Sequence, residues 1–301
     1  MHLVITDSGL GGLAVCAAAA KAFAESPGAG QTDVRITYFN CWPEERGGYN
    51  DMPDIAARAR VFDRALAAMA ALRPDRIVIA CNTLSVVYGH TAVSRVGTVP
   101  VLGIVDAGVD LFFEALAADP RSSIALFGTR TTIGSNVHRA RLIEKGIAPG
   151  RIAAVACHGL ARAIEMDPDG GAVASLIDRC TTAAGEAAPD GTPLHFGVCC
   201  THYTYVRDEM RAALERRSGR PVRELDPGDR LVGELMRLAG REDLPTGRLP
   251  TTSCRLPVSV TVVSKVEMDD RKRESMARRV EAASPATAAA LLSYTRVPDL
   301  F

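Results

Sequence analysis

Two cysteines, Cys81 and Cys200, each follow a short apolar segment and precede polar side chains. Two thiols on opposite sides of one carbon can exchange its proton, because one sulfur removes a proton from one face while the other returns a proton to the opposite face. A free thiol has a pKa of about 8.5, so it needs a lowered pKa or a proton acceptor to act as a base near neutral pH. Asp7, at the end of a strand expected beside that of Cys81, and His202, two residues after Cys200, are candidate acceptors. This residue set favours cofactor-independent proton exchange at the α-carbon of an amino acid.

Polar side chains next to the two cysteines are suited to hold the charged groups of an amino acid. Asn82 and Thr83 follow Cys81, and Thr201 and His202 follow Cys200. Their hydroxyl and amide groups can bind a carboxylate and an ammonium group. The same residue types are favoured caps of helices that begin after a strand, and a helix N-terminus attracts anions in any case. Capping and ligand binding are therefore compatible at both places.

The segments around these residues alternate between apolar strands and helical stretches. Strands are predicted at residues 2–6, 34–39, 76–80, 123–127, 152–156, 194–198 and 258–263, with a second set of elements starting near 99–104 and its first helix near 109–117. Continuously apolar strands separated by helices are typical of a parallel sheet covered on both faces, so the predicted class is α/β. The polar clusters follow the carboxyl ends of strands, where open parallel sheets bind ligands. The similarity of 79–83 to 198–202 predicts two pseudo-symmetric domains that face each other across a cleft.

The composition is that of an ordinary globular protein with a large core. With 301 residues, the chain is expected to form about two domains. It has 35 basic and 35 acidic residues, which argues against a nucleic-acid partner. No apolar run approaches the ~18 residues of a membrane span and no signal peptide is recognised, so we expect no membrane partner and a cytoplasmic location.

The other cysteines and the charged C-terminal segment have simpler interpretations. Scattered cysteines in a cytoplasmic chain stay reduced, and we interpret Cys16, Cys41, Cys180 and Cys254 as small buried hydrophobic residues. The run at 271–279 mixes arginines with acidic residues and is typical of a solvated helix face. The alanine-rich end of the chain has no predicted role.

Two other kinds of site fit the residues less well. Residues 9–14 match the G-x-G-x-x-A pattern of dinucleotide sites, but Asp7 would put a carboxylate beside the pyrophosphate, and the second strand ends at Asn40 instead of an acid. We interpret the glycines as a tight turn that lets a substrate approach the backbone. Soft metal ligands occur at 157–158 and 199–202, but without the C-x₂-C or H-x₃₋₅-H spacing of zinc sites. We therefore expect no cofactor and no metal.

Four motifs, in order along the chain, resemble those of the aspartate/glutamate racemase superfamily, and those of glutamate racemases most closely. They are residues 7–13, 80–83, 128–133 and 200–203. The spacing of Cys157 and Glu165 also matches the spacing in that family. The resemblance extends from about residue 3 to about residue 238.

This resemblance implies a cofactor-independent isomerase with two similar α/β domains and an active site between them. It implies Cys81 and Cys200 as acid and base, with Asp7 supporting Cys81 and with His202 and Glu165 supporting Cys200. The residues implied for the amino-acid head group are Ser8, Asn82, Thr83, Thr129, Thr132 and Thr201. The implied first domain contains residues 1–100 and 211–301, and the second contains residues 101–210. A homodimer is also implied.

The chain departs from this pattern where the substrate side chain is expected. Glutamate racemases carry a Pro-Tyr-Gly loop after the second strand, and this chain has Arg46-Gly47-Gly48 there. Leu84, Cys199 and Thr204 also replace an alanine, a glycine and a proline of the family pattern. Arg46 is either a substrate contact or an exposed loop residue. The expected substrate is glutamate or a related polar amino acid. The alternatives are a related isomerase or lyase acting on a small carboxylic acid, and a non-catalytic amino-acid-binding regulatory protein.

Overall fold

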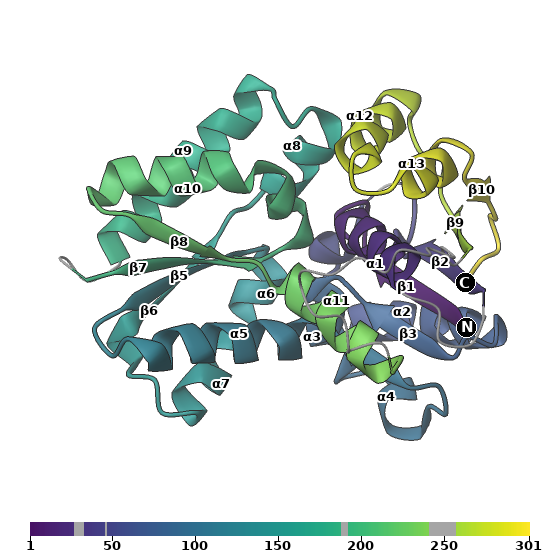
Figure 1. The fold of residues 1–301 in the computed structure, drawn as a ribbon, viewed down its shortest axis with the longest axis horizontal. Helices are drawn as coiled ribbons and strands as arrows, with labels where there is room; N and C mark the ends of the chain where they lie inside the picture. The colour runs from purple at the N-terminus through teal and green to yellow at the C-terminus, as the bar shows by residue number, and fades with distance from the viewer. Residues whose placement is uncertain (27–32, 46, 188–191, 241–256) are drawn as a thin grey trace, which may run out of the picture.

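Two parallel β-sheets, each covered by helices on both faces, form two domains that lie side by side (Figure 1). The computed structural model describes residues 1–26, 33–45, 47–187, 192–240 and 257–301. The predicted α/β class with two domains is confirmed. Two residues discussed above, Arg46 and Cys254, lie outside the described residues.

Domain 1 is built on a six-stranded sheet with the order β10-β9-β2-β1-β3-β4. Its strands are β1 (His2–Asp7), β2 (Val34–Asn40), β3 (Arg76–Ile79), β4 (Val101–Gly103), β9 (Val258–Ser264) and β10 (Thr295–Arg296). Every pairing among them is parallel. One face is covered by α1 (Leu13–Glu25), α11 (Pro227–Leu238), α12 (Asp270–Glu281) and α13 (Pro285–Leu292), and the other by α2 (Ile55–Ala71) and α3 (Asn82–Tyr88).

Domain 2 is built on a four-stranded parallel sheet with the order β6-β5-β7-β8. Its strands are β5 (Ser123–Gly128), β6 (Ile152–Ala156), β7 (Leu194–Cys199) and β8 (Val222–Leu225). One face is covered by α8 (Leu160–Met166), α9 (Gly171–Ala187) and α10 (Arg207–Ser218), and the other by α5 (Ile104–Ala118) and α7 (Val137–Glu144). Short elements complete it: α6 (Arg130–Gly134), η2 (Pro149–Arg151) and η3 (Thr201–Val206). Domain 1 adds η1 (Tyr49–Asp51) and α4 (Val93–Val96).

The continuous apolar character of the central strands follows from burial on both faces. In β1, Leu3 and Ile5 belong to the core beneath α1, and Val4 between them belongs to the core beneath α2. Successive side chains of a strand point to opposite faces, so a strand covered on both sides is apolar throughout. Because the strands of each sheet are parallel, the polar residues that follow them gather at one edge of that sheet.

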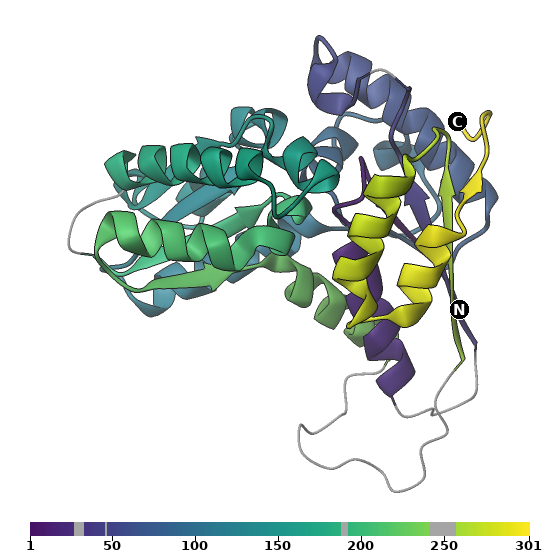
Figure 2. The ribbon, with the colours of Figure 1, turned by 90° about the horizontal axis from the view of Figure 1, so that it is seen from above.

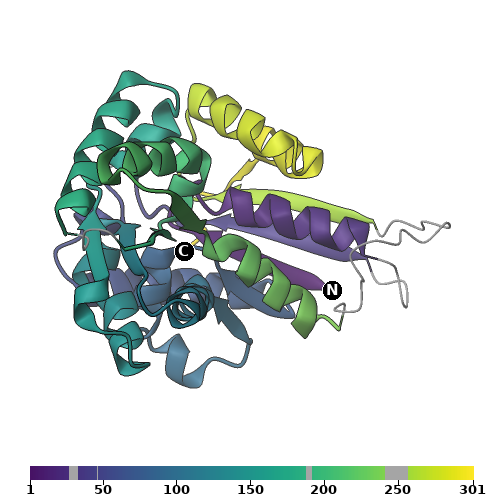
Figure 3. The same ribbon diagram turned by 60° about the vertical axis from the view of Figure 1, so that its left-hand side comes forward.

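The C-terminal segment, which had no predicted role, completes domain 1. Figure 2 shows α12 and α13 against α1, and β9 and β10 extend the sheet beyond β2. Helix α11 runs beside α1 and also packs on α5, so it joins the two domains (Figure 3). The predicted domain limits at residues 100 and 210 stay a prediction. In terms of sheets, β4 pairs within domain 1 and β8 within domain 2.

Two predicted elements differ in extent from those observed. Strand β4 has three residues, and α5 begins directly after it at Ile104 instead of near residue 109. Pro100, which lacks an amide donor, precedes β4, and only residues 101–103 pair with β3. Within the described ranges, no helix has the length and apolar character that a membrane crossing requires.

Candidate active site

The two cysteines line one cavity of about 740 Å³ between the carboxyl ends of the two sheets. Cys81 follows β3 of domain 1, and Cys200 follows β7 of domain 2. Of the predicted site residues, the structure brings all to the cavity wall except Thr132, which lies behind Thr83 and Thr129. The polar groups predicted at strand ends meet because both sheets direct their carboxyl ends toward the same space.

Cys81 is held at the start of helix α3. Its Sγ accepts a hydrogen bond from Leu84 N at 3.4 Å. The cysteine itself therefore caps helix α3, which is the role that the sequence also allowed for Asn82 and Thr83. The Ser8 hydroxyl lies 3.2 Å from the same sulfur. Burial, followed by the negative charge of Asp7, raises the pKa of the Cys81 thiol. Both effects favour the protonated thiol of Cys81 over its thiolate.

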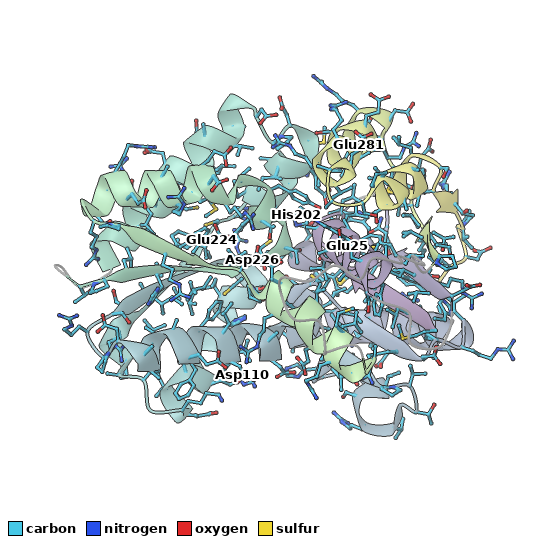
Figure 4. The ribbon with its side chains drawn as sticks, in the orientation of Figure 1. Glu25, Asp110, His202, Glu224, Asp226 and Glu281 are labelled. Carbon is cyan, nitrogen blue, oxygen red and sulfur yellow. The ribbon has the colours of Figure 1, made fainter. Side chains whose placement is uncertain are left out.

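Cys200 is the first member of a buried relay of three side chains. Its Sγ lies 3.8 Å from His202 Nδ1, and His202 Nε2 lies 2.6 Å from Glu165 Oε1 on helix α8. Figure 4 shows His202 where the two domains meet. Burial acts to lower the pKa of His202, but the hydrogen bonds to Cys200 and Glu165 outweigh it and raise that pKa well above 6.5. His202 can therefore take and hold a proton beside the Cys200 sulfur.

Glu165 carries a buried negative charge that several donors stabilise. Oε1 also accepts a hydrogen bond from Leu10 N at 2.8 Å, and Oε2 forms an ion pair with Lys272. Burial raises the pKa of this carboxyl, but Lys272 and then His202 outweigh burial and hold the pKa well below 4.5. Glu165 is thus ionised across the physiological pH range and orients the imidazole of His202.

Because the Glu165 carboxylate is held ionised in the fold, we expect the folded protein to lose stability in acid. Since the folded pKa of Glu165 lies below its ordinary value of 4.5, the carboxylate stabilises the fold fully above about pH 4.5 and progressively less as the pH falls. We expect the stability advantage of the wild type over Glu165→Gln, measured by urea unfolding between pH 7 and pH 3, to narrow below pH 4.5. Parallel profiles over that range would show that this carboxylate is not held ionised by the fold.

Asp7 contacts domain 2 rather than the Cys81 sulfur. Its Oδ2 accepts a hydrogen bond from the Thr201 hydroxyl at 2.8 Å, and its Oδ1 accepts one from Gly9 N at 3.1 Å. Strand β1 pairs in parallel with β3, as expected, so Asp7 lies beside the Cys81 segment, and Ser8 is the residue that reaches the thiol. Burial is the largest influence on the Asp7 carboxyl and raises its pKa.

Hydroxyl and amide groups of both domains line the cavity between the cysteines. The Thr83 hydroxyl lies 3.0 Å from that of Thr129 and 3.2 Å from that of Thr132, across the domain boundary. Asn82 is 2% exposed, and neither polar atom of its amide has a hydrogen-bond partner among the described residues. Because buried polar groups are nearly always paired, this amide is available to a ligand in the cavity.

The glycines after β1 allow the two domains to approach closely. A Cβ on Gly11 would come within 3 Å of Thr201 Oγ1 and His202 Nδ1, and one on Gly9 would do so with Glu165 Oε1. Gly9 lines the cavity, so the interpretation that these glycines let a substrate approach the backbone stays a prediction, and the relay residues of domain 2 also approach this backbone.

We expect Gly11→Ala to displace His202 and to lower activity at least about tenfold, with an overpacking penalty of about 1–3 kcal/mol in stability. Gly134→Ala is the matched control, since a Cβ there meets nothing within 4 Å. Reaction rates and thermal midpoints of the two variants check the expectation, which fails if Gly11→Ala behaves like the control.

The sequence-based prediction missed further cavity residues, among them Asn50, Trp42 and Lys272. Asn50 Oδ1 accepts a bond from Thr131 N at 3.4 Å, and Trp42 and Lys272 line the wall. Lys272 lies inside the charged run at 271–279, so the interpretation of that run as a solvated face is wrong at this position. A charged run of residues does not indicate that one of its lysines lines a cavity, because this placement depends on how α12 packs against α8.

Metal-ligand geometry is not seen among the cavity residues that the structure describes. Among the described residues, no group of three or more histidine, cysteine or acidic side chains is arranged to hold a metal ion. Cys157 and His158 line the cavity, whereas Cys199 points away from it into the core beneath α5.

The chain is similar to known racemases in sequence and fold. The family model described as Asp/Glu/Hydantoin racemase matches residues 11–234. The glutamate racemase of Jannaschia sp. (strain CCS1) is 31% identical over 232 residues, covering 71% of this chain and 77% of that protein. The glutamate racemase of Roseobacter denitrificans is 27% identical over 296 residues, covering 93% and 98%. The crystal structure of glutamate racemase from Francisella tularensis subsp. tularensis SCHU S4 in complex with D-glutamate has a TM-score of 0.67 at 18% identity and covers 93% of each chain.

The sequence relatives and the two-domain fold define an isomerase of the racemase class. Within this class, the chain belongs to the Asp/Glu/Hydantoin racemase family. The resemblance stated from the sequence is confirmed.

Proposed function

We propose that this protein racemises glutamate or a related polar amino acid with Cys81 and Cys200 as the two acid–base groups. The observation that supports this most strongly is that the two thiols line one cavity from the ends of opposite sheets. Relatives named glutamate racemase, which cover most of the chain, support glutamate as the first substrate to test. We also propose, from the family resemblance, that the protein acts as a homodimer in the cytoplasm.

The chemical step moves two protons in sequence. One cysteine, as thiolate, removes the α-proton and becomes a thiol, and the electron pair left on the α-carbon delocalises into the carboxylate. The thiol of the other cysteine then gives its proton to the opposite face of that carbon and becomes a thiolate. At Cys200, His202 accepts the thiol proton before the step and is held in place by Glu165. At Cys81, the Ser8 hydroxyl hydrogen-bonds the sulfur.

The remaining site residues are proposed to bind the amino-acid head group and to stabilise the carbanion. Donors placed where negative charge develops lower the barrier, because they need no reorganisation during the reaction. The unpartnered amide of Asn82 is the first candidate, since it is buried at the cavity wall. The hydroxyls proposed to act with it are those of Ser8, Thr83, Thr129, Thr132 and Thr201.

Isotope exchange tests this proposal directly. The protein is incubated with L- or D-glutamate in deuterium oxide, and optical rotation and Cα-deuterium are followed, with aspartate and a wider amino-acid panel in parallel. We expect loss of optical activity and deuterium in the newly formed enantiomer. No exchange with any amino acid would reject the racemase proposal, and binding without exchange would indicate a regulatory homologue. Release of an elimination product would indicate a lyase.

A further inference from the structure

Lys272 of domain 1 reaches across the domain boundary into the relay of domain 2. It lies in the first turn of α12, where the Asp269 side chain caps the helix by accepting a bond from Lys272 N at 3.1 Å. Its side chain is 22% exposed and ends in an ion pair with Glu165 Oε2 on α8. Figure 1 shows α8 and α12 next to each other at the domain boundary. A residue of the C-terminal helix is thus in contact with the group that orients His202.

Lys272 also contacts the loop that follows β2. Its Nζ lies 5.5 Å from the centre of the Trp42 ring, within the range of a cation–π interaction. The same ring lies against Gly48, since a Cβ on Gly48 would come within 3 Å of it. Both Trp42 and Gly48 line the catalytic cavity. Lys272 therefore connects the loop of domain 1 that departs from the family pattern to the Cys200 relay of domain 2.

We propose, on the basis of the function proposed above, that Lys272 is a positioning residue that fixes the Glu165 carboxylate against His202 when the two domains are together. Two of the bonds to Glu165 go to Oε1, from His202 and Leu10, and Lys272 binds Oε2. Without Lys272, one oxygen of a buried carboxylate loses its cation, and the carboxylate is free to rotate away from the imidazole.

The charge of Lys272 also acts on the proton affinity of the relay. Titratable or charged side chains face Glu165, His202 and Cys200 from several elements. They are Asp7 from β1, Tyr38 from β2, Cys157 after β6, Cys199 from β7, Tyr203 and Tyr205 from η3 and Lys272 from α12, with Arg162 of α8 at the cavity wall. Removing one positive charge from such a group favours the protonated form of every neighbour. Loss of Lys272 must therefore move the titration of His202 to higher pH.

The test compares Lys272→Met with Lys272→Arg, and uses Arg271→Met as the control. Arg271 is exposed on the same helix turn, and its replacement changes the net charge equally. In Lys272→Met we expect kcat to fall about ten- to a hundredfold with KM changed less than about twofold, because the lysine positions a catalytic group and does not hold the substrate. The pH profile of kcat is expected to move upward by about half a unit or more. Lys272→Arg and Arg271→Met should stay close to the wild type.

A second readout does not depend on the substrate. Alkylation of Cys200 by iodoacetamide, measured by peptide mass spectrometry as a function of pH, reports its thiolate and should shift upward in Lys272→Met only. This shift would support the role of Lys272 even if the wild type racemised no amino acid. An alkylation profile equal to that of Arg271→Met would overturn the proposal. A higher KM with an unmoved pH profile would also overturn it, since Lys272 would then bind substrate.

Discussion

Cys81→Ser and Cys200→Ser are each expected to lower interconversion of the two enantiomers by about 10⁴-fold, the upper end of what a positioned proton-transfer group contributes. A serine hydroxyl in the same buried position cannot ionise near neutral pH, so one face of the α-carbon loses its base and its acid. Polarimetry with either pure enantiomer measures the loss. A serine variant that racemises at the wild-type rate would remove that cysteine from the mechanism.

An elimination substrate distinguishes loss of one proton-transfer group from loss of the fold. When the β-carbon carries chloride, removal of the α-proton expels chloride and gives the dehydroamino acid, so one base is sufficient. Each serine variant should therefore retain elimination with one enantiomer of 3-chloroalanine, and the two variants should prefer opposite enantiomers. Cys199→Ala is the matched control, because Cys199 adjoins Cys200 but packs into the core on the other face of the sheet. Preference of both variants for the same enantiomer would contradict the two-sided arrangement.

His202→Asn is expected to have the second largest effect, a loss of about 10²- to 10³-fold in kcat/KM. The asparagine amide takes the place of Nδ1 beside Cys200 but cannot take the thiol proton, and it is too short to replace the Nε2 contact to Glu165. Proton transfer at Cys200 therefore becomes rate-limiting. Because the enantiomers have equal free energy in solution, kcat/KM must fall equally in both directions. The difference between the two reaction directions appears in the kinetic isotope effects instead.

The isotope effects identify the cysteine that His202 serves. For the enantiomer whose α-proton faces Cys200, the variant should show a larger effect of Cα-deuteration. For the other enantiomer, it should show a larger solvent deuterium effect, since Cys200 is then the proton donor. Isotope effects unchanged from the wild type in both directions would place His202 outside proton transfer. A core substitution such as Cys16→Ala, at a residue that does not line the cavity, controls for general loss of stability.

The fold class and the place of the site were predictable from the sequence for local reasons. Strands buried on both faces must be apolar throughout, as β1 is, and a ligand site on parallel sheets lies beyond their carboxyl ends. Asp7, Cys81, Thr129 and Cys200 stand at or just after the carboxyl ends of such strands, so their positions along the chain indicated the edge of the sheet at which they lie.

The contacts between the domains were not predictable in this way. The sequence determined that two thiols with polar neighbours stand at strand ends, because strand periodicity and chain order are local properties. Only the tertiary structure decided that Gly11 must leave room for His202, that Asp7 binds Thr201, and that Lys272 from a charged C-terminal helix pairs with Glu165. These pairs join residues far apart in the chain, and their geometry depends on how two separately folded sheets dock, which no local pattern of residues encodes.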